Sequence, residues 1–422
     1  MNKTEVSQNK IDNDSKKQSK HSQTFAALKH RNYRLWFWGQ IVSLLGSWMQ
    51  TTAQGFFIYE LTHSPAFLGF VGFAYGIPTW LFMVYAGVFA DKFRRRDIII
   101  VTQIIMMLLA FILAFLTFTH LIQPWHIILL AFLLGLANAF EAPARQAFVN
   151  ELVNREDLFN AIALNSTMFH SGAAIGPAVA GITYAVLGPA WCFTINGISF
   201  LGVIYNLFQM RFENSFVRPV GKSTSKELIS GFKYLKTQKL VLLLMLTIGM
   251  SSMLGIGMMT VIPAWAVKIL HGDASTNGLL QAARGIGAVV CSLVIASKSK
   301  YIARGKYLFA GMITLPVFML LFSFNTTFIL SCILLFGVGV GLIAINNLSN
   351  SLTQTIISEE FRGRIMGIYS FSFFGLMPIG ALWTGMIAEH FGSPIAVLAN
   401  SVLLLIFTGV IWIIYPKLVK IK

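Results

Sequence analysis

Long hydrophobic runs, separated by short polar or turn-forming stretches, dominate the chain. No Asp, Glu, Lys or Arg occurs from Leu61 to Ala90 or from Ile98 to Phe140. A membrane-spanning helix needs about 20 mostly apolar residues. Twelve segments have this length: 35–59, 65–90, 98–120, 125–145, 160–186, 190–210, 240–267, 275–297, 307–324, 328–352, 365–388 and 394–415. The runs are continuous and do not alternate as the strands of a β-barrel do, so they predict helices.

Composition agrees with this pattern. Of the 422 residues 56% are hydrophobic and only 11% are charged, whereas a soluble domain has about 25% charged residues. We therefore predict an all-α integral membrane protein. Cys192, Cys291 and Cys332 lie inside apolar runs, which favours packing over disulfide formation. The sequence contains no His/Cys cluster for a metal and no phosphate-binding loop, so we expect no metal, no cofactor and no enzymatic activity.

The positive charges predict how the chain crosses the membrane. The formal net charge is +16, and 30 of the 32 Lys and Arg residues lie in the tails and alternate loops. Positive charge stays on the cytoplasmic side. This predicts a multi-pass protein of the plasma (inner) membrane with both termini in the cytoplasm. The basic excess is then a topology signal, and we expect no nucleic-acid partner. The two exceptions are Lys268 and Arg284.

The loops divide the chain into five predicted parts. These are a disordered cytoplasmic tail (1–29), a first six-helix half (30–210), a cytoplasmic linker (211–239), a second six-helix half (240–416) and a cytoplasmic tail (417–422). In the linker, Leu228, Phe232 and Leu235 recur at helical spacing among lysines, which indicates an amphipathic helix on the membrane surface. A plain charged linker is the alternative.

Glycines recur at similar positions in the two halves. At an offset of 204, Gly176, Gly181 and Gly188 correspond to Gly380, Gly385 and Gly392; at an offset of 209, Gly69, Gly76 and Arg95 correspond to Gly278, Gly285 and Arg304. Two sets with nearly equal offsets indicate a duplicated six-helix unit. Such duplication is typical of transporters, which hold substrate between the repeats near the membrane midplane.

A charged loop lies between the second and third segments. It reads Gly87-Val-Phe-Ala-Asp91-Lys92-Phe-Arg94-Arg95-Arg96. It resembles the loop 2–3 signature of the major facilitator superfamily at Gly87, Asp91, Lys92, Arg95 and Arg96, while Arg94 stands where the family usually has Gly. The stretches Pro143-Ala-Arg145-Gln146-Ala147 and Asn160-Ala161 to Ser166 look like the drug–proton antiporter subgroup that contains macrolide exporters and the enterobactin exporter.

The resemblance covers nearly the whole chain beyond residue 25. It implies alternating access driven by the proton gradient. It also implies that Asp91 acts as a latch against the eleventh helix, near Arg364 to Gly367, when the inner side is closed. A solvated loop charge is the alternative. Gly172, Gly176, Pro177 and Gly181 are similar to the helix-five motif of antiporters, where close packing seals a proton leak; plain packing is equally consistent.

Glu141 is the one carboxylate that falls well inside a predicted spanning segment, and Arg145 follows one helical turn later. Burying an ionised side chain in a membrane costs at least about 2.5–3.5 kcal/mol. We interpret the pair as a proton-responsive gate, with a wet ion pair at the inner interface as the alternative. Glu60 and Glu389 lie at outer ends, where we expect them to be solvated or to admit protons.

Other polar residues in spanning segments are candidates for a substrate cavity: Gln50, Gln54, His170, Arg284, Asn346, Asn347 and Asn350. Such residues face a cavity or bond neighbouring helices. An Arg284 that lines the cavity would favour anionic or hydrogen-bond-accepting substrates; the alternative is that it extends outward. For His170 a neutral, hydrogen-bonded state is the alternative.

Together these features predict a proton-coupled exporter of an amphipathic small molecule such as a drug, macrolide or siderophore. We expect it to work as a monomer in the lipid bilayer. The alternatives are a lipid flippase and an importer on the same fold, because the sequence does not fix the direction of transport.

Overall fold

The structure of the protein is a computed structural model that describes residues 25–212, 234–235, 237–297 and 303–421, without the side chains of residues 83, 84, 91 and 420. All regular elements in these residues are helical. They are η1 (Ala26–Lys29), α2 (Arg31–Thr62), α3 (Pro65–Lys92), α4 (Arg95–Phe118), α5 (Pro124–Leu152), α6 (Leu158–Leu187), α7 (Pro189–Gln209), α9 (Lys239–Met250), η2 (Ser251–Ile256), η3 (Gly257–Val261), α10 (Ile262–Lys268), α11 (Ala274–Ser297), α12 (Arg304–Ser323), α13 (Phe328–Ile356), α14 (Glu359–Phe391), α15 (Ser393–Ile414) and η4 (Pro416–Lys420).

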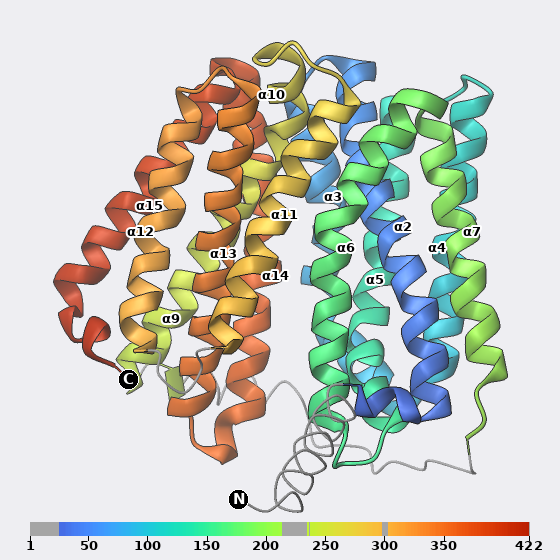
Figure 1. Cartoon of the computed structure of the whole chain (residues 1–422), viewed down its shortest axis with the longest axis horizontal. Coiled ribbons are helices and arrows are strands. Elements are labelled where there is room, and N and C mark those ends of the chain that lie inside the picture. The colour runs from blue at the N-terminus through green and yellow to red at the C-terminus, as the bar shows by residue number, and fades with distance from the viewer. Residues whose placement is uncertain (1–24, 213–233, 236, 298–302, 422) are drawn as a thin grey trace, which may run out of the picture.

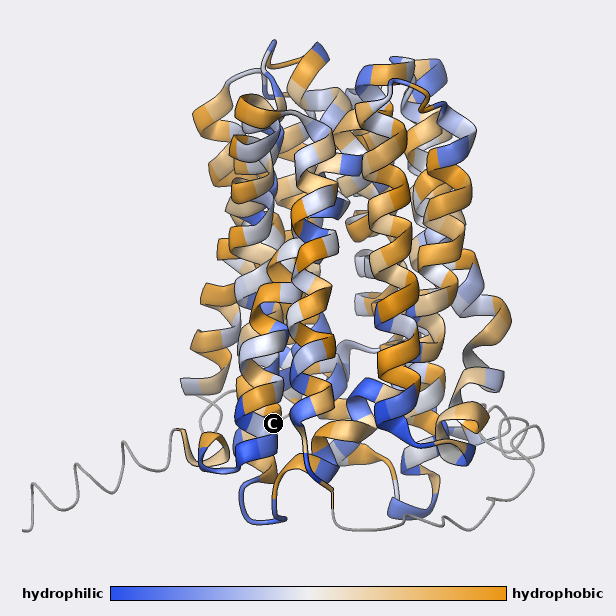
Figure 2. Cartoon of the chain, turned by 90° about the vertical axis from the view of Figure 1, so that its right-hand side faces the viewer, coloured by the Kyte–Doolittle hydropathy of each residue, from blue (hydrophilic) through white to orange (hydrophobic). Residues whose placement is uncertain are grey.

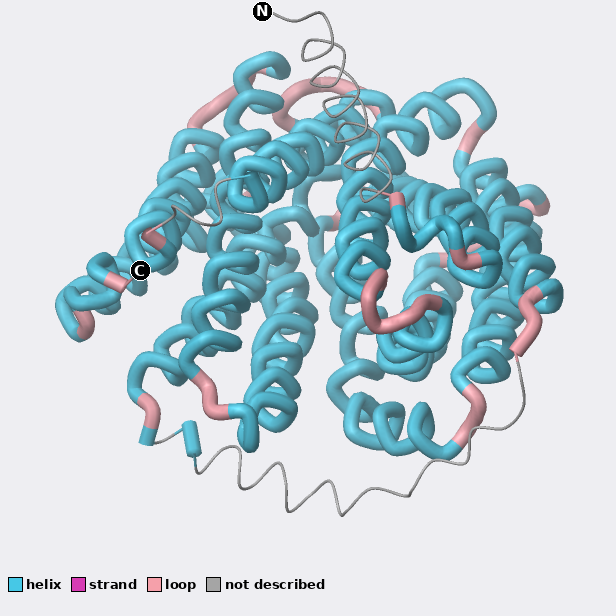
Figure 3. Tube along the Cα trace, turned by 60° about the horizontal axis from the view of Figure 1, so that its bottom comes forward, coloured by secondary structure: helices cyan, strands magenta, loops and turns pink. Residues whose placement is uncertain are grey.

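The helices form two sets that lie side by side (Figure 1). The first set is α2–α7 and the second set is α9–α15. Both the start of α2 and the end of α15 lie at one end of the bundle, which we name the terminal face; the other end is the opposite face. Hydrophobic residues dominate the long sides of the helices, and hydrophilic residues gather towards the terminal face (Figure 2). Seen from that face, the two sets stand next to each other (Figure 3).

Ten spans in the described residues are long and apolar enough to cross a membrane. One of them is the run Lys239–Lys268, which joins α9, η2, η3 and α10. The helices α2 and α6 are also long, with 32 and 30 residues, but they carry more polar side chains and are not among the ten. The structure therefore confirms an all-helical, multi-pass membrane protein, and the count of twelve crossings stays a prediction.

The predicted segments coincide with these helices, but some ends differ. The helix α5 continues to Leu152 and α14 begins at Glu359, so the predictions of 125–145 and 365–388 were too short. Both extensions lie beyond the most apolar residues, where hydropathy gives no signal. In α14, Glu359 and Glu360 occupy the first turn, where negative charge is stabilised by the free N–H groups.

Parts of the two predicted tails, 1–29 and 417–422, have regular structure. Ala26–Lys29 form a 3₁₀ helix, and Ala27 is fully buried and donates its backbone N–H to Asn160 at 2.9 Å. At the other end, Leu418 of η4 is buried, and Gly305 donates to the carbonyl of Ile421 at 3.0 Å. These contacts correct the predicted disordered tail at residues 26–29. Most of the predicted amphipathic helix in 211–239 lies outside the described residues.

Two helix crossings join the sets, and glycines make both possible. In the first crossing, α3 meets α14: a Cβ at Gly385 would lie 2.8 Å from the Cα of Gly69. In the second, α6 meets α11: a Cβ at Gly278 would lie 3.0 Å from the Cα of Gly181. Small residues let helix backbones approach this closely. At the offsets noted in the sequence, the first pair is the equivalent of the second, so the repeated glycines mark equivalent crossings.

The core is divided in the same way. One cluster of buried side chains belongs to α9–α15, and another belongs to α2–α7 near the terminal face. A third cluster joins Tyr59 and Ala180 of the first set with Ala264 and Ala274 of the second. The sets are thus packed together towards the opposite face.

Candidate functional site

Glu141 lies in α5 with only 2% of its surface exposed. Its Oε1 accepts a hydrogen bond from Gln103 Nε2 at 3.0 Å, and its Oε2 accepts one from Thr102 Oγ1 at 3.4 Å. Both donors come from α4, which packs beside α5. Buried polar groups need such partners, and the carboxylate itself is removed from solvent.

Arg145 follows Glu141 by one helical turn. Its Nη1 lies 3.9 Å from Glu141 Oε1, and 31% of the arginine side chain is exposed. One member of the pair is thus buried and the other reaches solvent-accessible space. A change in charge on the carboxylate would alter what the guanidinium contacts, so the pair has the geometry of a proton-responsive element.

Two arginines of the charged loop bind within the first helix set. Arg95 is 8% exposed, and its Nη1 donates to Glu151 Oε1 at 2.7 Å and to the carbonyl of Ala147 at 2.8 Å. Arg96 donates to the carbonyl of Phe208 at 3.3 Å. These bonds tie the start of α4 to α5 and α7.

The remaining loop positions are less constrained. Lys92 is exposed, and a methyl group on Gly87 would meet no described atom within 4 Å. Arg94 has φ −64° and ψ 122°, an extended conformation open to any residue, so the usual Gly is not needed here. The side chain of Asp91 lies outside the described residues, and its latch role stays a prediction.

The second set repeats one of these bonds. Arg304 at the start of α12 donates to Thr355 Oγ1 at the end of α13, at 2.8 Å. Arg304 and Thr355 are the equivalents of Arg95 and Glu151 at the two offsets. A neutral hydroxyl replaces the carboxylate, so this partner does not compensate the positive charge of Arg304.

A cavity of about 580 Å³ lies next to Arg304. Asn346, Asn347 and Asn350, which the sequence proposed as cavity residues, line it together with Arg304, Ser351, Gln354, Thr355 and Arg362. Asn347 donates to Ser292 of α11 at 3.1 Å, and Asn346 accepts from Tyr369 of α14 at 3.2 Å. The carboxamides are therefore fixed by neighbouring helices.

Arg284 lies about halfway along α11 on its inward side. Ile286 and Leu293 are 50% and 63% exposed and mark the outward side of this helix. Arg284 is two residues before Ile286, and so about 200° away around the helix axis. Gly285 packs on α6 and Gly287 on α13, which places Arg284 between these neighbours. Its Nε is buried and has no partner among the described residues.

The other proposed cavity residues have different surroundings. Gln50 is buried, and its Oε1 accepts a hydrogen bond from Asn196 of α7 at 2.7 Å. Gln54 is buried at 5% exposure. His170 is half-buried beside Phe169 and forms no hydrogen bond in the described part of the chain.

The helix-five motif packs on two neighbours. A Cβ at Gly172 would lie 3.0 Å from Trp48 Cδ1, and one at Gly176 would lie 2.5 Å from Trp48 Cβ. Further along α6, the carbonyl of Pro177 faces Gly278, and a Cβ at Gly181 would lie 2.7 Å from the carbonyl of Ala274. The motif thus holds α6 against α2 and α11.

Glu389 forms a contact that the sequence did not predict. It accepts hydrogen bonds from Ser64 Oγ at 2.7 Å and from the backbone N–H of Ala66 at 3.1 Å. The C-terminal end of α14 thereby caps the first turn of α3 at the opposite face. Glu60 accepts a hydrogen bond from the hydroxyl of Tyr184. Both carboxylates are more than solvated ends, but residues so far apart in sequence give no local signal of such pairing.

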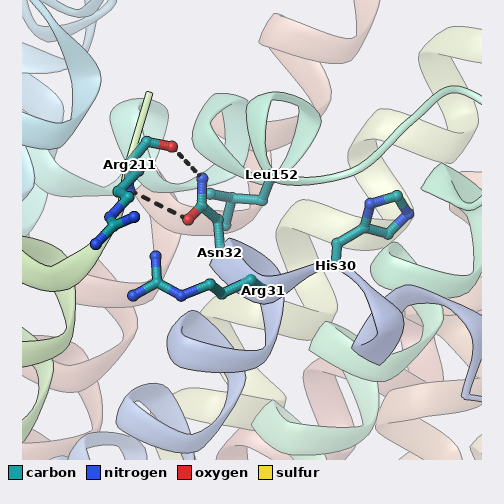
Figure 4. Close-up of a pocket in the computed structure, with 5 residues that line it drawn as sticks. All are labelled: His30, Arg31, Asn32, Leu152 and Arg211. Carbon is teal, nitrogen blue, oxygen red and sulfur yellow. Dashed lines mark hydrogen bonds between the residues drawn. The ribbon is translucent and has the colours of Figure 1, made fainter. Parts of the chain in front are cut away.

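A smaller pocket of about 320 Å³ lies at the terminal face of the first set (Figure 4). His30, Arg31, Asn32, Leu152 and Arg211 line it. Asn32 donates to the carbonyl of Arg211 at 2.8 Å and accepts from its N–H at 3.3 Å. This pocket joins the start of α2 to Arg211, two residues after the end of α7, and its lining residues all belong to or adjoin the first set.

Residues 22–421 match the family described as transmembrane secretion effector. The staphyloferrin A transporter of Staphylococcus aureus is 25% identical, covering 85% of this chain and 90% of the relative. The macrolide efflux protein A of Streptococcus pyogenes is 21% identical, covering 86% and 92%. The enterobactin exporter of Escherichia coli O1:K1 is 26% identical, covering 90% and 91%.

The fold is also similar to solved structures. One is a bacterial homolog of the human lysosomal transporter Spinster in an inward-facing, unoccupied conformation. Its TM-score is 0.73 at 13% identity, covering 93% of this chain and 98% of that one. The family and these relatives are membrane transporters and not enzymes, which confirms the resemblance drawn from the sequence.

Proposed function

Because the chain belongs to the transmembrane secretion effector family, within the major facilitator superfamily, we propose that it exports an amphipathic small molecule in exchange for protons. A drug, a macrolide or a siderophore is the candidate substrate, as the names of the macrolide and enterobactin relatives suggest. We place the terminal face in the cytoplasm of a plasma-membrane protein, because the tails and loops that the sequence assigns to that side hold 30 of the 32 Lys and Arg residues.

Contacts between the sets support alternating access. Towards the opposite face, Glu389 caps α3 and the glycine crossings hold the sets together. Towards the terminal face, a methyl group on Gly87, Gly363 or Gly367 would meet no described atom within 4 Å. This arrangement is that of a state open towards the terminal face, which is the state that would take up a substrate from the cytoplasm.

The observation that carries the proton coupling is the burial of Glu141. The ionised carboxylate is stabilised by Arg145 and by hydrogen bonds from Gln103 and Thr102. A proton on Glu141 would remove its attraction for Arg145. The guanidinium, which is partly exposed already, would then be free to pair elsewhere, with Asp91 as the partner we propose. A ligand changes a conformational equilibrium only through such differential contacts.

The substitution Glu141→Gln tests this mechanism, because glutamine keeps the size and a hydrogen-bond acceptor but cannot release a proton. The substrate is first identified by comparing the drug resistance and exported metabolites of a deletion strain with those of its parent. In inverted vesicles, we expect the variant to lose uptake driven by a pH gradient while it keeps substrate exchange without a gradient. Glu156→Gln, at an exposed position, is the matched control. Unchanged gradient-driven transport in Glu141→Gln would remove Glu141 from the mechanism.

A further inference from the structure

The cavity at the terminal face of the second set has an unusual balance of charge. Its lining residues include two arginines, Arg304 and Arg362, and no Asp or Glu. Arg362 has an acidic neighbour in Glu359, which lies 3.9 Å from it and is itself 91% exposed. Because this pair is exposed and its charged atoms are far apart, Glu359 compensates little of the positive charge of Arg362.

Hydrogen-bond donors remain available in this cavity. Arg304 donates through Nη1 to Thr355, and a guanidinium has five N–H donors in all. The Tyr369 hydroxyl donates to the backbone carbonyl of Asn346 at 2.9 Å and lies 3.2 Å from its carboxamide oxygen. The amide nitrogen of Asn346 has no partner among the described residues. The cavity therefore presents donors where a bound molecule must supply acceptors.

A further cation lies deeper along the same wall. Asn347 binds Ser292 of α11, and Arg284 lies eight residues before Ser292 on that helix, a rise of about 12 Å. Its buried Nε without a partner is costly to leave unbound. A buried guanidinium with an open donor is a good partner for a carboxylate, because the two groups match in charge and in planar geometry.

We infer that this cavity binds a small polycarboxylate anion, so that the exported molecule carries two or more carboxylates; the inference rests on the proposed export for its transport role. Arg304 and the free amide of Asn346 would bind carboxylate oxygens near the terminal face. Arg284 would bind the anion as it moves away from that face towards the middle of the bundle. The volume of about 580 Å³ falls within the range of small-molecule sites. A lipophilic cation would meet two arginines and no carboxylate here.

The test is direct binding to the purified full-length protein in nanodiscs of phosphatidylcholine, a lipid without net charge. The probes are citrate and tricarballylate, which each carry three carboxylates, and tetraphenylphosphonium, a lipophilic cation. We expect calorimetric binding of the two carboxylates and none of the cation. Arg304→Gln, Arg284→Gln and Asn346→Leu should each weaken carboxylate binding, by about tenfold or more for the arginines.

Lys306→Gln is the matched control, because it removes one positive charge from an exposed side chain two residues after Arg304 that does not line the cavity. It should change the affinity for the carboxylates less than twofold. This result would separate direct contacts in the cavity from the long-range effect of net positive charge. Size-exclusion profiles and thermal unfolding check that each variant folds, and Arg304→Lys adds a variant that keeps the charge and loses the planar fork. Its affinity should lie between those of the parent and Arg304→Gln.

Three results would overturn the inference: no binding of either carboxylate, equal binding by the parent and both arginine-to-glutamine variants, or tighter binding of tetraphenylphosphonium. The export proposal fails by a different result. If carboxylates bind through the arginines but vesicles show no gradient-driven transport, the cavity assignment stands and the export function does not. If a macrolide is exported in a Glu141-dependent way without carboxylate binding, the reverse holds.

Discussion

Arg95 and Glu141 are both buried charged side chains of the first helix set, but their surroundings differ. Arg95 binds a carboxylate at 2.7 Å and a carbonyl at 2.8 Å. Glu141 lies 3.9 Å from its cation and is otherwise held by neutral groups. The close pair is suited to a fixed structural bond, and the looser one is suited to a change of partner.

Arg95→Gln should therefore destabilise the fold. The substitution removes two short, charge-assisted bonds, to Glu151 and to the carbonyl of Ala147, which corresponds to a loss of about 1.5–3 kcal/mol. The unfolding free energy in detergent measures this loss. Lys92→Gln, at an exposed position of the same loop, should change it by less than about 0.5 kcal/mol. Equal stability of the two variants would show that the Arg95 bonds contribute nothing.

Asp157 predicts a pH dependence at the terminal face. The ammonium of Lys29 and the ring of His30 both lie 2.7 Å from its Oδ2 and lower the pKa of the carboxyl below its ordinary value. A group whose pKa is lower in the folded state stabilises the protein above its unfolded pKa of about 3.9. That contribution is lost as the pH falls through the folded value.

We expect Asp157→Asn to unfold at a lower temperature than the parent at pH 7. The gap between the two should shrink as the pH falls below about 4, because the parent then loses the same ion pairs. Thermal unfolding from pH 7 to pH 3 measures the gap. The exposed neighbour variant Glu156→Gln should show no such trend, and a gap that is constant with pH would contradict the assignment.

At the scale of helices, the repeat explains why the two crossings look alike. Gly385 faces Gly69 and Pro65 on one side of the bundle, and Gly278 faces Gly181 on the other. The equivalence ends at Glu389, because its counterpart at an offset of 204 is Ala185. The carboxylate cap on α3 is thus a feature of one crossing only.

Gly69→Ala and Gly278→Ala should have effects of the same sign and similar size. A Cβ at Gly69 would lie 2.9 Å from the carbonyl of Ala381, and a Cβ at Gly278 would overlap the carbonyl of Pro177. Overpacking of this kind costs about 1–3 kcal/mol. Gly202→Ala is the control: an added methyl meets no described atom within 4 Å, and alanine favours the helix by about 1 kcal/mol. Thermal unfolding compares the three, and opposite signs at Gly69 and Gly278 would refute their equivalence.

The sequence predicted the helices well because each spanning segment is a local run, readable without knowledge of its neighbours. The glycines that recur at fixed offsets predicted a repeated six-helix unit, but only the structure shows that they mark the two crossings. The sequence singled out Asn346, Asn347 and Asn350 as candidate cavity residues because polar residues are conspicuous in an apolar helix. It missed the cap at Glu389 and the α4 partners of Glu141, Thr102 and Gln103, because these depend on helices that only packing brings together. The predicted helix ends were wrong where the helix continues into polar residues beyond the apolar run, as at the end of α5 and the start of α14.

At the scale of the whole molecule, we propose that two carboxylates act on the same conformational equilibrium: Glu389 near the C-terminal end of α14 and Asp91 near the C-terminal end of α3. Glu389 holds the opposite face together in the structure. Asp91 is proposed to hold the terminal face together after the sets have rocked. A carboxylate at a helix N-terminus contributes about 0.3–2 kcal/mol, and states that differ by a few kcal/mol respond to changes of this size.

The two carboxylates should therefore respond with opposite signs. Glu389→Ala removes a contact of the described state, so pairs of spin labels across the opposite face should show more of a long distance, and pairs across the terminal face more of a short one. Asp91→Asn weakens the other state, so the terminal-face distance should lengthen instead. Glu389→Gln keeps a hydrogen-bond acceptor for Ser64 and should fall between the parent and Glu389→Ala. If both variants moved the terminal-face distance in the same direction, the carboxylates would not act on opposing closures, and Asp91 would be a solvated charge of the loop.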